Sequence, residues 1–479
     1  MQPWYWRSLP LENRTGSEIF SALFRHDSTQ IATLLESPYP TPPDQTKLAR
    51  YSICAGAQRI INGHSQLWTP PLGKVLPFLQ QLLLQVASRE SQAASDSPPN
   101  SLPFTGGWLG WLGYDLAWEI ERLPYLKSDL LPFPVAFWYE PECFAVLDHK
   151  EQILWLAASE RTQLDTLQNQ LAQSHNLTIS PSPLLPLSPS PHLPTLLTSQ
   201  IDYETAVHRA KKYIQAGDIF QANLSLRFEA QTTADAWAIY LALQQINPSP
   251  FASYWRTPWG TVISCSPERL VQLQNRQAST RPIAGTRRRG TTLEQDQQLA
   301  QELITNVKER AEHTMLVDLE RNDLGRVCKW GSVVVDELLT IERYSHVMHL
   351  VSNIKGNLRP DCNAVDLIRA MFPGGTITGC PKVRCMSIIQ ELEPVRRNLF
   401  YGSCGYLDWR GNLDMNILIR TLLLASLPQD NPKSIVWGQV GAGIVADSDP
   451  EREWYESLQK AQAQLTALEK ASKYSEIEN

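Results

Sequence analysis

The 479-residue sequence has little that would direct it to a membrane or to export. Its first residues show no basic segment followed by an apolar run, so no signal peptide is expected. No stretch approaches about 18 uncharged apolar residues, so no membrane span is expected either. With 43 basic and 49 acidic residues the net charge is −6, and without a basic excess no nucleic-acid partner is expected. We therefore expect a cytoplasmic protein.

Paired cysteines are also missing. The eight cysteines are scattered and none forms a CxxC motif, so neither a zinc site nor a redox dithiol is indicated. In a chain without an export signal we expect them to be reduced, mostly buried thiols.

The composition is that of a globular protein, with 43% hydrophobic and 19% charged residues. A Pro- and Ser-rich stretch, SPSPLLPLSPSPHLP at residues 180–194, predicts an extended connector. We divide the chain into an N-terminal region (1–175), this connector (176–200), a C-terminal region (201–470) and a tail (471–479). Trp108, Trp111 and Trp118 lie in a Gly-rich segment that predicts a packed sheet.

Hydrophobic periodicity predicts several elements in both regions of the chain. They are a hairpin over residues 144–158, helices over 162–173, 202–217 and 294–316, a meander with strands at 401–409, 415–426 and 435–440, and a final helix from Pro450.

Two acidic pairs are spaced for metal binding. Glu309 and Glu312 are three residues apart in a predicted helix, so their carboxylates share one face. Glu453 and Glu456 repeat this spacing in the last helix. Together they offer oxygens to one Mg²⁺, although each pair alone also suits an ordinary solvated helix face.

Anion-binding features lie in the same half of the chain. Arg420 interrupts an apolar segment, where a buried guanidinium needs an anion, either a structural carboxylate or a ligand. The loop FPGGTITGCPK (372–382) opens a predicted helix whose amides can bind an anion, with Lys382 in the first turn. GQVGAGIV (438–445) is a second glycine-rich strand end.

Three further residues are candidates for proton transfer or for orienting a substrate. His346 and His349 lie three apart in a predicted strand, so they point to opposite faces and one of them can face a cavity. Glu268 beside a strand end can act as a general acid, or form a surface ion pair. Combined with the acidic pairs and the arginine, these residues suit a small dianionic substrate.

Six motifs occur in order over residues 281–456: RPIAGTRRRG, KERAEHTMLVDLERNDLGRV, YSHVMHLVSNIKG, FPGGTITGCPKVR, GNLDMNILIRT and GAGIVADSDPEREWYE. They closely resemble the chorismate-utilising enzymes, namely component I of anthranilate synthase and of aminodeoxychorismate synthase. The resemblance implies an α+β fold in which two large antiparallel sheets pack as a sandwich with flanking helices. It also implies that the two regions form one compact unit.

The resemblance implies roles for individual residues. Mg²⁺ would bind Glu312 and Glu453, supported by Glu309 and Glu456. Chorismate would be the substrate, its ring carboxylate lying on the metal, Thr376 and loop amides such as that of Gly375, with Lys382 nearby. The residues implied for the enolpyruvyl carboxylate are Arg420, Tyr406, Gly441, Ala442 and Gly443. Glu268 would help the 4-hydroxyl leave, and His349 would act as a base or orienting group.

Several segments, including QANLSLRF and NPSPFASYW, resemble aminodeoxychorismate synthase component I most. Its activity is amination of chorismate to 4-amino-4-deoxychorismate for p-aminobenzoate and folate. The alternatives are anthranilate synthase component I, for tryptophan, and a non-catalytic chorismate-binding subunit. Some aminodeoxychorismate synthases carry a nucleophilic Lys in a PIKGT motif where this chain has Ala284, which implies direct attack by ammonia or another nucleophile. A separate glutamine amidotransferase subunit is implied as the ammonia source.

The segment LLES resembles part of the tryptophan-binding region of anthranilate synthases. The resemblance implies a possible tryptophan site at Leu35, Glu36 and Ser37.

Overall fold

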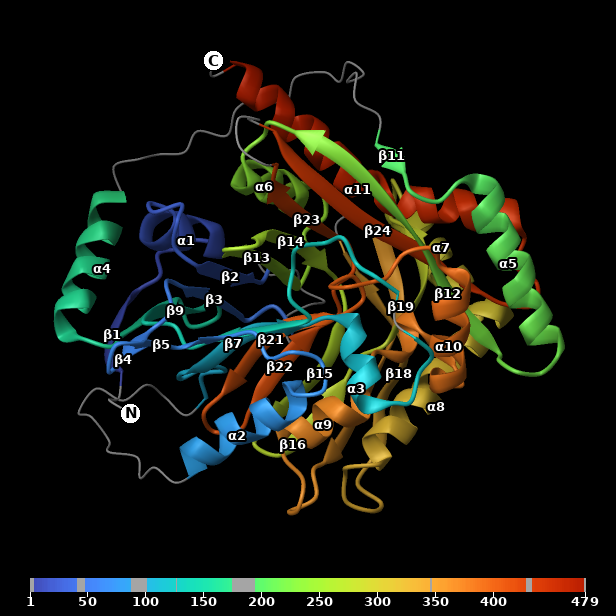
Figure 1. The fold of residues 1–479 in the computed structure, drawn as a ribbon, viewed down its shortest axis with the longest axis horizontal. Coiled ribbons are helices and arrows are strands. Elements are labelled where there is room, and N and C mark those ends of the chain that lie inside the picture. The colour runs from blue at the N-terminus through green and yellow to red at the C-terminus, as the bar shows by residue number, and fades with distance from the viewer. Residues whose placement is uncertain are drawn as a thin grey trace.

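The computed structural model describes residues 4–40, 48–87, 101–125, 127–174, 194–344, 347–427 and 433–477. Two large antiparallel sheets with helices packed around them make up the fold (Figure 1). The predicted α+β class with two antiparallel sheets is therefore confirmed. Most of the predicted connector lies outside the described residues. Within the described ranges, no helix combines the length and apolar character needed to cross a membrane.

The larger sheet has twelve strands, all paired antiparallel. In spatial order they are β1 (Tyr5–Pro10), β10 (Ile153–Ala158), β9 (Cys143–Asp148), β3 (Tyr51–Ala55), β2 (Ala32–Glu36), β13 (Phe251–Thr257), β14 (Gly260–Ser266), β23 (Thr421–Ser426), β24 (Ser434–Ile444), β12 (Gln221–Thr232) and β11 (Thr195–Leu196), with β20 (Gly379–Cys380) also on β12.

The smaller sheet has ten strands. Their spatial order is β17 (Ile283–Arg288), β19 (Val347–Asn357), β16 (Gln277–Thr280), β15 (Arg269–Gln274), β22 (Leu413–Asn416), β21 (Ser403–Asp408), β7 (Gly107–Leu112), β8 (Ala136–Tyr139) and β6 (Leu67–Trp68), with β18 (Val334–Arg343) also on β19.

The core between the sheets is rich in tryptophan. Trp111 on β7 and Trp255 on β13 come from different sheets, and their ring centroids are 6.0 Å apart at an interplanar angle of 78°. Trp108 and Trp138 are also fully buried in this cluster. The core positions predicted for Trp108 and Trp111 are confirmed. Trp118 is only half-buried, and its indole N–H donates to the carbonyl of Pro124.

Helices cover the outer faces of both sheets, and several of them carry candidate residues. Against the larger sheet and one another pack α1 (Gly16–Phe24), α4 (Arg161–Ser174), α5 (Gln200–Gln215), α6 (Ala236–Ile246), α10 (Lys382–Leu392) and α11 (Pro450–Ile477). Against the smaller sheet lie α7 (Leu293–Thr305), α8 (Val307–Gly325) and α9 (Ala364–Met371), and α2 (Val75–Ala87) packs on α9.

The helix predicted over residues 294–316 is wrong as a single element. It is two helices, because Asn306 ends α7 and caps α8, where its side-chain oxygen accepts from the Glu309 amide at 3.0 Å. An Asn side chain competes with the helical backbone for such donors. Val307, the first residue of α8, is 82% exposed.

The strand predicted over residues 415–426 is also wrong. Residues up to Asn416 form β22 in the smaller sheet, whereas β23 begins at Thr421 in the larger one. Between them Arg420 adopts φ +53°, which turns the chain from one sheet to the other. The sequence pattern does not reveal this crossing, because the residues on both sides of Arg420 are largely buried and mostly apolar.

The N-terminal and C-terminal regions contribute strands to the same sheets. β2 pairs with β13 through contacts such as Leu34 with Tyr254, and β7 pairs with β21 through Leu109 with Tyr406. This interleaving supports the proposal of one compact unit.

Candidate functional site

The candidate site lies where the chain crosses between the two sheets. Glu268 occupies the link between β14 and β15, and Arg420 occupies the link between β23 and β22. Backbone hydrogen bonds join the crossings, since the Cys265 amide donates to the Arg420 carbonyl (3.2 Å) and the Ile417 amide to the Glu268 carbonyl (3.0 Å). The fold thus brings together two candidates that are 152 residues apart in sequence (420 − 268).

Glu268 has the properties of a proton donor. Its side chain is buried, and burial raises the pKa of its carboxyl to about 8, with a smaller rise from the charge of Glu320. The nearby Thr376 hydroxyl acts in the opposite direction. A carboxyl with this pKa keeps its proton at neutral pH, which general acid catalysis requires.

Thr376 lies in the one-turn helix η3 (Gly375–Ile377), next to Glu268. Its buried hydroxyl oxygen forms no hydrogen bond of normal geometry with the described residues. Its carbonyl is 3.5 Å from the Asn223 side-chain amide, whose own oxygen is likewise buried and unpartnered within those residues. Unsatisfied buried polar atoms of this kind are expected where a ligand supplies the partner.

His349 is a buried residue of β19. Burial lowers the pKa of its imidazole to about 4, and the Arg420 charge adds to that effect. Its Nδ1 is 3.0 Å from the Thr286 hydroxyl. The neutral ring is therefore held in place and suits an orienting role more than storage of a proton. His346 lies outside the described residues.

The Arg420 guanidinium has the character of an anion receptor. It donates to the Lys460 carbonyl, and no carboxylate among the described residues lies within ion-pair distance of it. Burial lowers the pKa of Arg420, while the phenol of Tyr401 acts in the opposite direction. A desolvated guanidinium without a counter-ion favours a carboxylate ligand.

The glycine-rich end of β24 runs beside β12 at this site. A Cβ on Gly441 would lie 2.3 Å from the Leu224 carbonyl, and one on Gly443 would lie 2.4 Å from the side-chain nitrogen of Gln221. Gly441 therefore requires glycine because backbone opposes it, whereas at Gly443 the flexible Gln221 side chain can move away. Ala442 is fully buried in the core shared with the outer helices, so its side chain does not line the site.

The four candidate metal ligands come from the N-terminal turns of α8 and α11. Burial raises the pKa of both Glu312 and Glu453, and the neighbouring glutamate of each pair raises it further. Lys308 and Lys460 lower both pKa values, which places the two carboxylates around the same two lysines.

This donor set fits Mg²⁺ in chemistry. Burial and the neighbouring glutamates raise the pKa values of Glu312 and Glu453, so a cation would stabilise their ionised forms, and Mg²⁺ prefers carboxylate oxygens. Glu312 accepts from Gln221 at 3.0 Å, Glu309 pairs with Arg287 at 3.2 Å and Glu456 pairs with Lys460 at 2.9 Å. Among the described residues no three His, Cys, Asp or Glu side chains already gather as a metal site.

Lys382 and Gly375 do not face the candidate site as expected. The Lys382 ammonium is buried in an ion pair with Asp323 at 2.5 Å and also donates to the Met371 carbonyl. The Gly375 amide donates to Glu320 at 3.3 Å. Both groups are bound to partners inside the protein and fix the loop at residues 372–382, so neither is free to bind a substrate.

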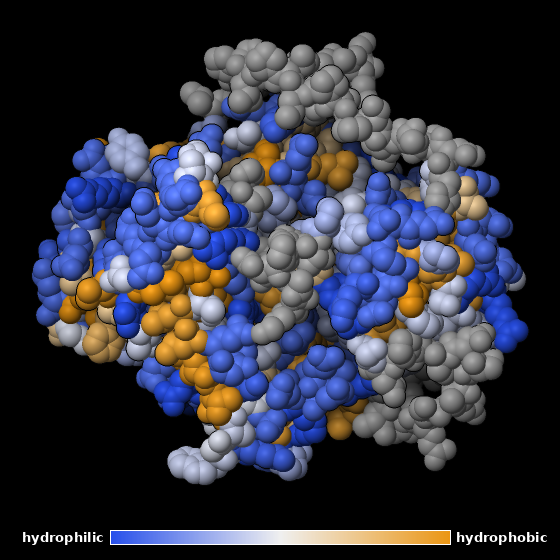
Figure 2. Space-filling view, turned by 180° about the vertical axis from the view of Figure 1, so that it is seen from behind, coloured by the Kyte–Doolittle hydropathy of each residue, from blue (hydrophilic) through white to orange (hydrophobic). Residues whose placement is uncertain are grey.

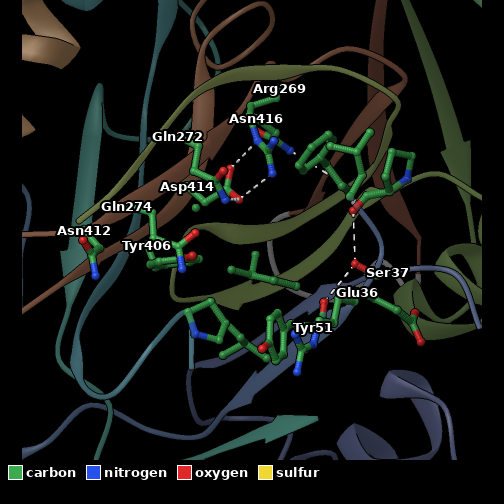
Figure 3. A pocket seen from close by; sticks show the side chains of 18 of the residues that line it. Glu36, Ser37, Tyr51, Arg269, Gln272, Gln274, Tyr406, Asn412, Asp414 and Asn416 are labelled. Atoms are coloured by element: carbon green, nitrogen blue, oxygen red, sulfur yellow. Dashed lines mark hydrogen bonds and ion pairs between the residues drawn. The ribbon is translucent and has the colours of Figure 1, made fainter. Parts of the chain in front are cut away.

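Tyr406 lies in a different place, a cavity of about 490 Å³ (Figure 3). Leu35, Glu36 and Ser37 line the same cavity, so the fold brings the possible tryptophan residues together with Tyr406. The Glu36 carboxylate accepts from Ser17 and Tyr240, and the Ser37 hydroxyl donates to the Tyr51 carbonyl. Arg269, Asp414 and Gln272 form a hydrogen-bonded group on the opposite wall, drawn in Figure 3.

The hydroxyl near Arg420 belongs instead to Tyr401, which sequence reasoning missed. Arg397 lies over its ring at 4.6 Å, pairs with Glu393 at 2.7 Å and donates to the Ile377 and Asn223 carbonyls. The i,i+4 spacing of Glu393 and Arg397 was an available signal, although it does not reveal the partners.

Ala284 is buried on β17, directly before a bulge at Gly285. The sequence itself has no lysine at this position, and Ala284 pairs with Leu350 of β19.

Comparison with known proteins is consistent over the whole chain. The family model described as chorismate binding enzyme matches residues 36–466. A crystal structure of anthranilate synthase component I from Streptococcus pneumoniae superposes with a TM-score of 0.71 at 32% identity, covering 87% of this chain and 92% of that one.

Curated relatives carry names of both activities. An anthranilate synthase component I-like protein of Synechocystis is 62% identical, over 98% of this chain and 93% of its own length. The anthranilate synthase component 1 of the same organism is 41% identical, over 77% of each chain. Aminodeoxychorismate synthase component 1 of Bacillus subtilis is 44% identical, over 78% of this chain and 79% of its own.

Proposed function

Because this chain belongs to the family of chorismate binding enzymes, we propose that it is a component I that aminates chorismate to 4-amino-4-deoxychorismate. The observation that carries an amination is the pairing of Glu268, protonated at neutral pH, with an uncompensated Arg420 at the same crossing of the sheets. One group releases a hydroxyl as water, and the other holds a carboxylate of the substrate.

In the proposed reaction ammonia forms a C–N bond at C4 of chorismate as the C4–O bond breaks, and one proton of the resulting ammonium group returns to the Glu268 carboxylate. Glu268 gives its proton to the leaving hydroxyl, so that water departs instead of hydroxide. Arg420 and Tyr401, with the backbone of Gly441 and Gly443, hold the enolpyruvyl carboxylate. His349, fixed by Thr286, orients the ring.

Mg²⁺ would be held by Glu312 and Glu453, with Glu309 and Glu456 supporting. When bound it would neutralise the ring carboxylate of chorismate. The Thr376 hydroxyl, which lies beside Glu268 but forms no hydrogen bond of normal geometry with the described residues, would donate to the same carboxylate.

The relatives favour 4-amino-4-deoxychorismate as the product. Synechocystis has a protein named anthranilate synthase component 1 that is 41% identical to this chain, beside a second protein that is 62% identical. An organism with a dedicated anthranilate synthase has no need of a second one, so the more similar protein is expected to serve another amination.

Anthranilate is the second candidate product, and Ala284 favours it. Without a lysine nucleophile at this position, ammonia is expected to attack ring carbon 2 directly. Loss of pyruvate from a 2-amino intermediate would then give anthranilate.

The deciding experiment incubates the purified chain with chorismate, Mg²⁺ and an ammonium salt. We expect chorismate to be consumed without anthranilate fluorescence, and p-aminobenzoate to form only after aminodeoxychorismate lyase is added. Anthranilate formed without the lyase would contradict the proposed product and support the second candidate. Binding of chorismate without any turnover would leave the third alternative, a non-catalytic subunit.

Ammonia is proposed to come from a separate glutamine amidotransferase subunit. Activity with glutamine as the only nitrogen source should therefore require that second subunit, whereas activity with ammonium salts should not.

The cavity lined by Leu35, Ser37 and Tyr406 is proposed as a site for tryptophan. Its support is the gathering of these residues around about 490 Å³ of space. Calorimetric titration with tryptophan, with Tyr406→Ala as the comparison, tests this proposal.

A further inference from the structure

A second buried carboxyl lies behind the loop that carries Thr376. Glu320 on α8 is 3% exposed, and its Oε1 accepts the Gly375 amide at 3.3 Å. Its other oxygen, Oε2, is buried and has no hydrogen-bond partner among the described residues. The nearby Thr280 hydroxyl donates its hydrogen bond to the Leu270 carbonyl. A half-satisfied buried carboxyl is costly to a fold, so its presence requires an explanation.

The surroundings of Glu320 hold more acid than base. Asp323, three residues on along the same helix, takes the Lys382 ammonium at 2.5 Å. Lys382 is therefore shared by two buried carboxyls, those of Glu320 and Asp323. Glu268 lies beside Thr376 of the same loop. Burial raises the pKa of both Glu320 and Asp323, whereas the Lys382 charge lowers both.

Glu268 faces few groups that would stabilise its anion. The Thr376 hydroxyl and the Ile283 backbone, which lie beside its carboxyl, favour its ionised form. Glu320 has the opposite effect, and the Tyr344 phenol is a further titratable group close enough to interact with Glu268. The loop thus contacts both carboxyls, Glu320 through the Gly375 amide and Glu268 through Thr376.

We infer that Glu320 is a positioning residue, which holds the Gly375 turn in place and keeps Glu268 in its proton-donating form. This inference rests on the proposed function, because it concerns the acid of that same site. A negative charge on Glu320, behind the loop, makes ionisation of Glu268 less favourable. Glu268 therefore stays protonated up to a higher pH.

The test is the pH dependence of kcat/KM for chorismate, measured at a fixed concentration of free ammonia. Glu320→Gln keeps an acceptor for the Gly375 amide and removes the charge. In this variant the alkaline limb of the kcat/KM profile should move to a lower pH by about one unit. The activity at pH 6 should stay within about twofold of the wild type. Asp318→Asn, at an exposed site on the same helix, is the matched control and should not shift the limb.

Glu320→Asp provides a second variant, since it keeps the charge and withdraws it by one methylene. It should keep the alkaline limb near that of the wild type and raise KM about fivefold, because the Gly375 amide loses its acceptor. An unchanged limb in Glu320→Gln, or equal shifts in Glu320→Gln and Glu320→Asp, would overturn the inference.

Glu268→Gln separates this outcome from failure of the proposed function. If Glu268→Gln removes the activity and Glu320→Gln leaves the limb in place, only the inference on Glu320 fails. If Glu268→Gln keeps both the rate and the limb, Glu268 is not the acid and the proposed mechanism itself fails.

Discussion

Burial acts on Glu268 and His349 in opposite directions and leaves both of them neutral. It raises the pKa of the carboxyl to about 8 and lowers that of the imidazole to about 4. Desolvation penalises the charged form of either group, and that form is the anion for one and the cation for the other. Arg420, beside His349, is therefore the charge left to attract an anionic substrate.

Glu268→Gln should abolish most of the turnover while stabilising the fold at alkaline pH. Loss of a general acid costs about 10² to 10⁴ in rate. The folded-state pKa of about 8 lies above the ordinary 4.5, so the wild type loses stability as the pH rises from 4.5 through 8. The variant has no such loss, and its free energy of unfolding should exceed that of the wild type by about 2 kcal/mol or more at pH 8.5.

Urea unfolding at pH 5 and pH 8.5 measures this difference, which should fall to about 1 kcal/mol or less at pH 5. The surface variant Glu160→Gln serves as the control. A stability difference that does not depend on pH would contradict the raised pKa of Glu268.

Arg420→Gln should weaken chorismate binding without lowering stability. Removing one charge-assisted pair to a carboxylate costs about 2 to 3 kcal/mol, which corresponds to a rise in KM of about 30- to 150-fold. The free energy of unfolding should not fall, because the described residues offer the guanidinium no counter-ion. Steady-state kinetics and urea unfolding measure the two effects. Arg256→Gln, which removes a half-buried arginine bound to backbone carbonyls of residues 24 and 30, should leave KM unchanged.

At the scale of elements, the sequence predicted individual elements better than their connections. The hairpin at 144–158 and the final helix follow directly from periodicity and turn residues, and they are present as β9–β10 and α11. The sequence did not predict the helix break at Asn306 or the change of sheet at Arg420. The cap at Asn306 lies within a continuous helical pattern, and the change of sheet depends on partner strands that lie far away in the chain. For the same reason Tyr406 was expected beside Arg420, where the fold places Tyr401.

The motif residues were assigned to the site mainly from the family resemblance and less from their spacing in the sequence. Spacing alone pairs Glu309 with Glu312 and Glu453 with Glu456, but says nothing of which pair faces the other. The inward-facing roles of Lys382 and Glu320 depend on α8 packing behind the loop, which no local pattern encodes.

Asn306→Ala should loosen the start of α8, which carries both Glu309 and Glu312. Losing the cap costs about 1 kcal/mol in the free energy of unfolding. The apparent affinity for Mg²⁺, measured from the metal dependence of turnover, should fall with it because the two carboxylates become less well placed. Asn306→Asp keeps a capping oxygen and should behave like the wild type. An Asn306→Ala variant with lower stability and unchanged metal affinity would argue against α8 as part of the metal site.

At the scale of the whole molecule, neither region completes a sheet alone. Figure 1 shows the N-terminal strands, drawn in blue, continuing into strands of the C-terminal region. The hydropathy of the opposite face in Figure 2 is mostly polar with separate apolar areas, as expected when the large apolar surfaces lie between the sheets.

Residues 1–194 and 195–479, produced as separate chains, should therefore fail to fold independently. Without β13, the strand β2 would expose an unpaired edge, and without β7, Tyr406 and its neighbours on β21 would lose their partner strand. The tryptophan cluster would be split as well, since Trp111 and Trp255 fall in different fragments. Circular dichroism and urea unfolding measure the outcome: the full chain should unfold in one cooperative transition, and neither fragment should show one. A cooperative transition in the longer fragment alone would mean that the catalytic region is an autonomous domain, and that the shared sheets contribute little to its stability.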